Sequence, residues 1–159
     1  MAMDALIKPL LRLEIFQGLK PLQITEIARQ AERIVFREGD IIVHSGASGD
    51  AAYVIVSGEA VCLKRSGTNV RAEPIEAGSL VGELAMLVEH DYSITVVAKT
   101  PVRALKLSRE AMHGQMRDDR HLAEHISGKI TARLTKLAAE LRTIDGRLAR
   151  VAEARVELR

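Results

Sequence analysis

Short apolar runs rich in Val and Ile, separated by glycines, fill the chain between residues 32 and 107 and constrain its fold more than any other feature. The runs lie at 34–36, 41–43, 53–56, 60–63, 94–98 and 102–105, and the separating glycines are Gly39, Gly46, Gly49, Gly58, Gly67 and Gly78. Many short strands with glycine turns at this spacing are typical of an antiparallel sandwich or barrel. No long helical pattern separates the runs, which argues against a parallel α/β sheet.

Helical patterns flank this β-region on both sides. Residues 2–30 carry apolar side chains at helical spacing, and we predict two helices there. Ser108 is a candidate N-cap for a short helix ending near Gly114, and a long helix is predicted to begin at Asp118 or Asp119. The predicted class is therefore α+β. We expect three segments: N-terminal helices over 1–31, a β-domain over 32–107, and a hinge with a long amphipathic helix over 108–159.

The long predicted helix carries a narrow apolar stripe with alternating spacings of four and three residues. Its members are Ile130, Leu134, Leu137, Leu141, Ile144, Leu148 and Val151. Such a two-position heptad seam favours a partner helix, and we expect a homodimer or a higher homo-oligomer over a helix that packs only on its own domain. The flanking charges leave the geometry open, because Glu140 and Asp145 would repel each other in a parallel dimer.

Composition excludes several classes of protein. The 159 residues have a net charge of only +2, which argues against a general nucleic-acid-binding surface. The single cysteine, Cys62, excludes a disulfide framework and a Cys-rich metal site. The longest apolar stretch, 80–88, is too short to span a bilayer, and the N-terminal residues show no signal-peptide pattern. We therefore expect a cytoplasmic protein with no membrane association.

One short segment, Gly82-Glu83-Leu84-Ala85, interrupts the strand pattern with helix-forming residues. Together with Gly39-Asp40, Ser57-Gly58 and residues 93–98, in this order, it resembles the cyclic nucleotide-binding domain of catabolite activators, protein kinase A regulatory subunits and cyclic-nucleotide-gated channels. The resemblance covers almost the whole β-region.

The resemblance implies a jelly-roll-like β-roll of about eight strands that senses a cyclic nucleotide, cAMP or cGMP, and needs no other cofactor. The implied ligand-binding residues are Val81, Gly82, Glu83, Leu84, Ala85, Tyr92 and Ser93. Glu83 is expected to bind the ribose hydroxyl, while backbone N–H groups with Tyr92 and Ser93 bind the phosphate. Leu137 and Ala138 are expected to cover the base.

Three departures from the family pattern qualify these expectations. Tyr92 stands where the family has a phosphate-binding arginine, and losing one charged bidentate contact costs about 2–4 kcal/mol, so we expect weak binding. Leu137-Ala138 replace a base-contacting Thr-Ser pair of the bacterial activators. No helix-turn-helix segment follows before Arg159, so we expect no direct DNA binding, and either a piece of a larger protein or regulation through another protein partner.

Other functions remain open at this point. An enzyme or a metal site is not expected, because the five histidines, His44, His90, His113, His121 and His125, form no ligand cluster in the pattern. Relatives of the family bind haem or aromatic acids in the same roll, so a different small ligand is one alternative. A ligand-free dimerisation or scaffold module is another.

Overall fold

A computed structural model describes residues 2–157, so the outermost positions of the first and last predicted segments lie outside the described residues. The chain forms two compact units, one ending at Leu122 and one beginning at Ala123. Each unit is described by itself.

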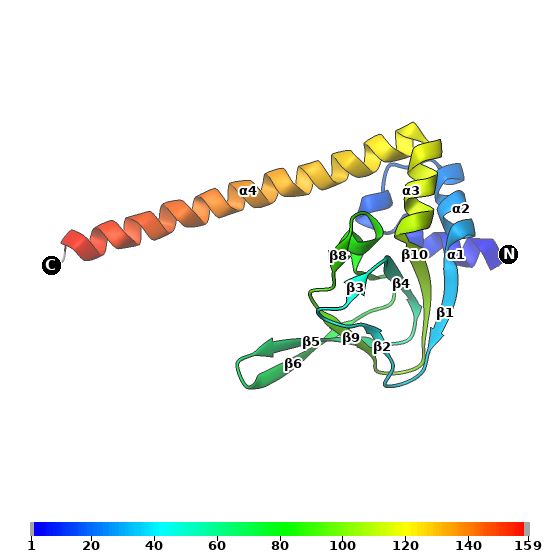
Figure 1. The fold of residues 1–159 in the computed structure, drawn as a ribbon, viewed down its shortest axis with the longest axis horizontal. Helices are drawn as coiled ribbons and strands as arrows, with labels where there is room; N and C mark the ends of the chain where they lie inside the picture. Colours follow the sequence, from blue (N-terminus) through cyan, green and yellow to red (C-terminus); the bar gives the residue numbers. More distant parts are fainter. Residues whose placement is uncertain (1, 158–159) are drawn as a thin grey trace. The chain divides into compact units, whose positions relative to one another are not determined.

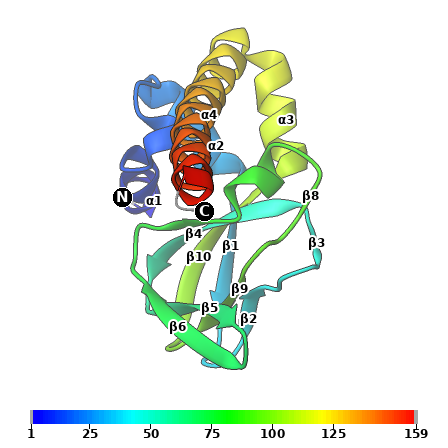
Figure 2. The same ribbon diagram turned by 90° about the vertical axis from the view of Figure 1, so that its left-hand side faces the viewer.

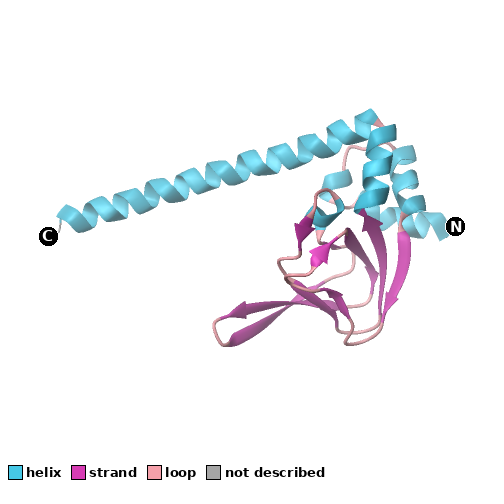
Figure 3. Cartoon of the chain, in the orientation of Figure 1, coloured by secondary structure: helices cyan, strands magenta, loops and turns pink. Residues whose placement is uncertain are grey.

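The first unit is built on ten short strands within the described residues, and all their pairings are antiparallel. The strands are β1 (Glu32–Phe36), β2 (Ile41–Val43), β3 (Ser48–Gly49), β4 (Ala51–Ser57), β5 (Ala60–Ser66), β6 (Asn69–Ile75), β7 (Leu80–Val81), β8 (His90–Asp91), β9 (Thr95–Ala98) and β10 (Val102–Ser108). They form two four-stranded sheets, ordered β1-β10-β4-β7 and β2-β9-β5-β6, and a small β3-β8 pair (Figure 3). This arrangement confirms the predicted α+β class and antiparallel β-roll.

The core of the roll follows from the alternation of apolar side chains along the strands. In β9, Val96 and Ala98 are buried while Thr95 and Val97 are only partly buried. The buried residues Val96 and Ala98 pack in one cluster with residues of the other strands, such as Ile55 and Val102. The roll is therefore held together by the apolar runs that the sequence showed.

Strand β6 was not predicted, because it lacks the apolar alternation that reveals a half-buried strand. Its side chains are almost all exposed, and Pro74 lies near its end. Proline is tolerated there because β6 is the edge strand of its sheet. The β5–β6 hairpin projects from the roll (Figure 1), and an ion pair between Lys64 Nζ and Glu73 Oε2, 3.0 Å apart, joins its two strands.

Helices gather at one end of the strands (Figures 1 and 2). They are α1 (Ala2–Leu11), the short 3₁₀ turn η1 (Glu14–Phe16), α2 (Pro21–Gln30) and α3 (Arg109–Asp118). Both predicted N-terminal helices are thus confirmed. Ser108 caps α3 by accepting a hydrogen bond from the Ala111 N–H at 3.1 Å. The prediction that this helix ends near Gly114 was wrong, because a glycine inside a helix weakens it without ending it.

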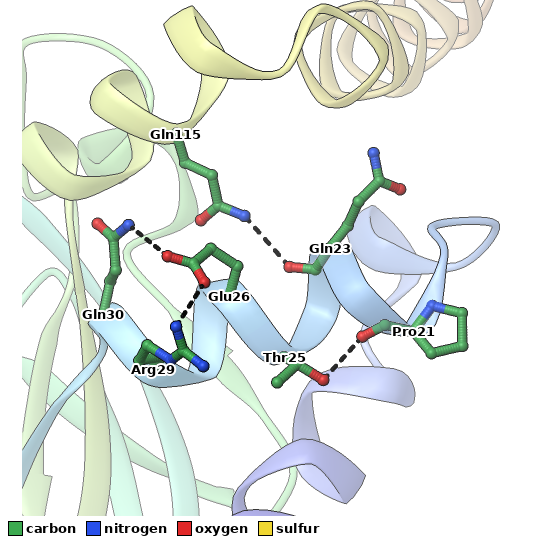
Figure 4. A network of polar contacts seen from close by, with 7 residues as sticks. All are labelled: Pro21, Gln23, Thr25, Glu26, Arg29, Gln30 and Gln115. Carbon is green, nitrogen blue, oxygen red and sulfur yellow. Dashed lines mark hydrogen bonds and ion pairs between the residues drawn. The ribbon is translucent and has the colours of Figure 1, made fainter.

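Gln23 of α2 joins three helices. Its backbone carbonyl accepts a hydrogen bond from Gln115 of α3 at 3.2 Å (Figure 4). Its side-chain amide donates to Asp119 Oδ2 at 2.9 Å. Asp119 in turn accepts from the Leu122 N–H at 3.1 Å, and so caps the start of α4 (Arg120–Glu157), close to the predicted beginning.

The second unit consists of α4 from Ala123 onward. Its seam residues Leu134, Leu137, Leu141, Ile144, Leu148 and Val151 are between 49% and 62% exposed. An apolar stripe of this extent is typical of a helix that packs on another surface. No helix within residues 2–157 has the length and hydropathy needed to cross a membrane.

Candidate functional site

The Gly82 segment is a sharp turn between β7 and the one-turn 3₁₀ helix η2 (Glu83–Met86). Gly82 has φ +74°, in the left-handed region that side chains disfavour. Val81, Ala85 and Met86 are buried, whereas Leu84 is 46% exposed. Val81 and Ala85 therefore anchor the segment in the core, while Gly82 and Glu83 are partly exposed.

Tyr92 is an internal packing residue in this structure. It is 9% exposed, and its hydroxyl donates a hydrogen bond to the Ala51 carbonyl at 2.7 Å. A Cβ on Gly82 would lie 2.8 Å from Cε1 of the Tyr92 ring, and a Cβ on Gly49 would lie 2.9 Å from its Cζ. Both glycines thus leave room for this ring.

Burial raises the pKa of the Tyr92 hydroxyl above its ordinary value, and the electrostatic interactions with Tyr53, when that group ionises, and with the Asp50 carboxylate add to the effect. The hydroxyl therefore stays protonated at neutral pH, and its only proton is bonded to Ala51. In this arrangement Tyr92 offers no donor to a phosphate, so the role implied by the family resemblance would require the side chain to move.

Arg109 is a site residue that the sequence analysis missed. It is the first residue of α3, and its Nη1 donates to the carbonyls of Gly49 at 3.0 Å, Ala85 at 3.4 Å and Val88 at 3.0 Å. One guanidinium thus joins α3 to Gly49 of β3 and to the segment that contains Ala85 and Val88. A signal existed: a cation in the first turn of a helix opposes the helix dipole, and so calls for acceptors elsewhere.

His113 provides a second link between α3 and the end of η2. Its Nε2 lies 2.5 Å from the Leu87 carbonyl oxygen, one turn of helix after Arg109. The Gly82–Val88 segment is therefore held from the core side by Ala85 and Met86, and from α3 by Arg109 and His113.

Two cavities in the roll share Ile94 as a lining residue. The first, of about 400 Å³, is lined by Gly82 with mainly apolar neighbours such as Leu80 and Val81, and we call it the Gly82 cavity. Glu76 is the ionisable residue among its lining. Of the predicted ligand-binding residues, Val81 and Gly82 line this cavity.

The second cavity, of about 740 Å³, we call the basic cavity. Its polar lining residues are His44, Ser45, Lys64, Arg65, Ser93 and Thr95. Ser93, a predicted phosphate-binding residue, is thus beside cations that the sequence analysis did not identify. They were missed because Lys64 and Arg65 lie in β5, which the sequence marked only as a strand. Glu83, Leu84, Ala85 and Tyr92 line neither cavity.

The remaining predicted residues lie in the second unit. Leu137 and Ala138 are exposed positions of α4. Because this unit is described by itself, their role in covering a base stays a prediction. No group of three or more His, Cys, Asp or Glu residues within 2–157 is arranged to hold a metal ion.

The chain is similar to known proteins both in sequence and in fold. The sequence model of the cyclic nucleotide-binding domain matches residues 33–119. The regulatory subunit of cAMP-dependent protein kinase from Aspergillus niger is 32% identical over 121 residues, which are 74% of this chain and 29% of that protein. The chain spans about a quarter of the length of the curated relatives it matches.

Solved structures share the fold. The N-terminal domain of a transcriptional regulator from Streptomyces coelicolor matches with a TM-score of 0.78 at 22% identity, over 87% of this chain and 95% of that one. A cyclic nucleotide-binding-like protein from Brucella abortus matches with a TM-score of 0.66 at 26% identity, over 72% of this chain and 99% of that one.

Proposed function

The chain belongs to the cyclic nucleotide-binding domain family, and from this premise we propose that it is a regulatory domain, not an enzyme, that binds cAMP or cGMP in the roll. The observation that carries the proposal is the Gly82 turn, which borders a cavity in the segment where the family binds its ligand. Glu83, at the start of η2, is the residue proposed to accept a ribose hydroxyl, since an ionised carboxylate is an acceptor only.

We propose that the affinity is low compared with relatives that have the arginine. Tyr92 brings no positive charge, and its hydroxyl proton is bonded to Ala51. No cation lines the Gly82 cavity. Charge-assisted hydrogen bonds are about twice as strong as neutral ones, so a phosphate here lacks its usual contribution.

The relay of binding is proposed to run through α3. Arg109 and His113 connect α3 to the carbonyls of Ala85, Leu87 and Val88. A ligand that prefers one position of the Gly82–Val88 segment therefore also prefers one position of α3, and with it one arrangement of the start of α4.

Self-association through α4 is proposed as the output of the domain. The exposed seam, centred on Leu141 and Ile144, supports it, because an isolated helix gains nothing from exposing such a stripe. A regulated protein partner and the predicted cytoplasmic location stay predictions.

A second candidate ligand class is favoured by one observation. The Gly82 cavity is lined mainly by apolar residues, including Ile75, Leu80 and Ile94. Such a lining suits an uncharged or weakly anionic small molecule in place of a nucleotide. If neither a nucleotide nor another small molecule binds, the ligand-free scaffold is the remaining function.

The test is calorimetric titration of the purified chain with cAMP and with cGMP. Binding at micromolar to sub-millimolar ligand that weakens in Glu83→Ala supports the proposal. Glu89→Ala is the matched control, because Glu89 is exposed and lines neither cavity. No heat of binding up to millimolar ligand would overturn the proposal, and would direct the search to small molecules that co-purify with the chain.

A further inference from the structure

The two cavities that share Ile94 differ in charge. The Gly82 cavity is lined by a carboxylate, Glu76, and by no cation. The basic cavity is lined by His44, Lys64 and Arg65, and by no carboxylate. An anionic group on a ligand in this part of the roll is therefore attracted to the basic cavity and repelled from the Gly82 cavity.

The two long cations of the basic cavity are not equivalent. Lys64 is paired with Glu73, and the hydrogen bond from this partner raises the pKa of the ammonium group. Arg65, the next residue of β5, has no ion pair with any side chain that the structure describes. Its guanidinium offers the planar pair of donors that matches a phosphate. The hydroxyl of Ser93 lines the same cavity.

We propose that the basic cavity is the anion subsite of this domain. Arg65, with the Ser93 hydroxyl, binds the cyclic phosphodiester of the ligand in place of the arginine that Tyr92 replaces, whereas Lys64, the preceding residue of the strand, points to the opposite face of the sheet and stays with Glu73. This inference rests on the proposed function, since it assigns the charge contact of the same ligand. Because Arg65 is exposed, the contact is sensitive to salt.

The experiment compares cAMP with adenosine, which has the same base but no phosphate, in the full chain. We expect cAMP to bind more tightly than adenosine in the wild type, and Arg65→Ala to lower the affinity for cAMP by about tenfold while leaving that for adenosine unchanged. Arg71→Ala is the matched control, because Arg71 is an exposed cation of the same hairpin that lines neither cavity.

Three results are informative. A preference for cAMP that is lost in Arg65→Ala, kept in Arg71→Ala, and reduced at high salt in the wild type supports the subsite. An equal preference for cAMP over adenosine in the wild type, Arg65→Ala and Arg71→Ala would overturn the subsite while leaving the proposed function intact. A wild type that binds neither compound, and does not bind cGMP in the same titration, would overturn the proposed function and this inference with it.

An independent observation concerns α4. If two copies of the seam pair in antiparallel orientation, one register matches every seam residue from 134 to 151. In it Leu134 faces Val151, Leu137 faces Leu148, and Leu141 faces Ile144 of the second copy. These six positions are the exposed apolar side chains of the helix, so this register buries them all.

The charges beside the seam select the same arrangement. A parallel pair brings Glu140 next to Asp145 of the second copy, twice. The antiparallel register brings Glu140 next to Arg147, twice. Sliding the antiparallel pair by one heptad in one direction brings Arg133 beside Arg147, and in the other direction brings two Arg147 side chains together. Only the first antiparallel register combines pairing of all six exposed seam residues with opposite charges beside them.

We infer that the partner of the α4 seam is a second copy of this chain in antiparallel orientation, with Leu141 opposite Ile144. This inference rests on the proposed self-association and adds its direction and register. The helix is continuous from Arg120 to Glu157 within the described residues, so the seam needs no rearrangement to present both halves.

Variants of the full chain that each add one cysteine to the buried Cys62 test the orientation under mild oxidation. In the antiparallel register, positions 134 of the two copies are about 25 Å apart along the helix, well beyond the reach of a disulfide. We expect Leu134→Cys alone to form no dimer disulfide, and a mixture of Leu134→Cys and Val151→Cys to form one between unlike chains. The wild type is the control, because its Cys62 is buried.

A charge variant gives a second measurement, by sedimentation. In an antiparallel dimer, position 140 lies beside Arg147, so Glu140→Arg weakens the dimer by repulsion. In a parallel dimer, position 140 lies beside Asp145, so the same variant strengthens the dimer. Glu140→Arg/Arg147→Glu should restore the antiparallel dimer. A Leu134→Cys homodimer disulfide or a strengthened Glu140→Arg dimer would overturn the orientation alone. A wild type that stays monomeric at high concentration would overturn the proposed self-association as well.

Discussion

The hydroxyl of Tyr92 distinguishes most sharply between the role implied by sequence resemblance and the role suggested by the structure. If it serves the fold, Tyr92→Phe removes a 2.7 Å buried hydrogen bond and leaves the Ala51 carbonyl without this donor. Such a loss costs about 1–2 kcal/mol in the free energy of unfolding. The ring stays in place against Gly82 and Gly49, so no cavity contributes to this value.

Urea denaturation followed by far-UV circular dichroism measures the change, since the chain has no tryptophan. Tyr53→Phe is the matched control. Tyr53 is half-buried with its ring edge-on to Phe36, centroids 5.9 Å apart, and phenylalanine keeps that contact. We expect the control to change the free energy of unfolding by less than about 0.5 kcal/mol.

The pH dependence of stability gives this prediction a second arm. Burial raises the pKa of Tyr92 above 10.0 in the folded chain. The resulting contribution to stability is present below the unfolded pKa and is lost as the pH rises through the folded one. The stability difference between wild type and Tyr92→Phe should therefore shrink above about pH 10.

A Tyr92→Phe protein as stable as the wild type, with cAMP affinity lowered about tenfold, would refute this reasoning. That result would mean that the hydroxyl donates to the phosphate, as the resemblance implies, and that its bond to Ala51 contributes nothing to folding.

Three further predictions address the turn, the link to α3 and the seam. Gly82→Ala should lower the free energy of unfolding by about 1–3 kcal/mol more than Gly78→Ala. Both glycines have positive φ, but only Gly82 lies against the Tyr92 ring. Equal losses of stability in urea titration would argue against this close packing. Arg109→Ala should destabilise the chain by about 1–3 kcal/mol in the same assay, since three carbonyls lose a donor, and an unchanged midpoint would refute the link. Leu141→Lys should shift the chain toward monomer in sedimentation, whereas Thr143→Lys, off the seam, should not; equal masses for both variants would remove the seam as the interface.

The elements that the sequence predicted are those whose apolar residues recur with a clear period. Strands β5 and β9 and helix α2 bury mainly one face each, which leaves a period in the sequence, whereas β4 is buried on both faces and appears as a continuous apolar run. Strand β6 leaves none, because an edge hairpin exposed on both faces needs no apolar alternation.

The site was less predictable than the fold. The Gly82 segment was recognised because its helix-forming residues interrupt the strand pattern, which is a property of one short stretch of sequence. The packing of Tyr92 between Gly49 and Gly82 depends on residues far apart in the sequence. The three carbonyls bound by Arg109 come from two segments far from it in the sequence, Gly49 and the Gly82–Val88 segment, and backbone acceptors have no sequence signature. The cations of the basic cavity could be identified only once the structure showed that β5 lies close to Ser93.

The bonds of Arg109 have a thermodynamic consequence that reaches beyond this chain. Linkage is reciprocal: if ligand binding to the Gly82–Val88 segment changes the equilibrium of α3 by some factor, then whatever fixes α3 changes ligand affinity by the same factor. A protein that grips α3 would thereby retune the sensitivity of the roll without touching the ligand. The ligand concentration at which such a domain responds would then depend on the proteins bound to it. Affinities measured on the separate chain would give only the value without such a partner.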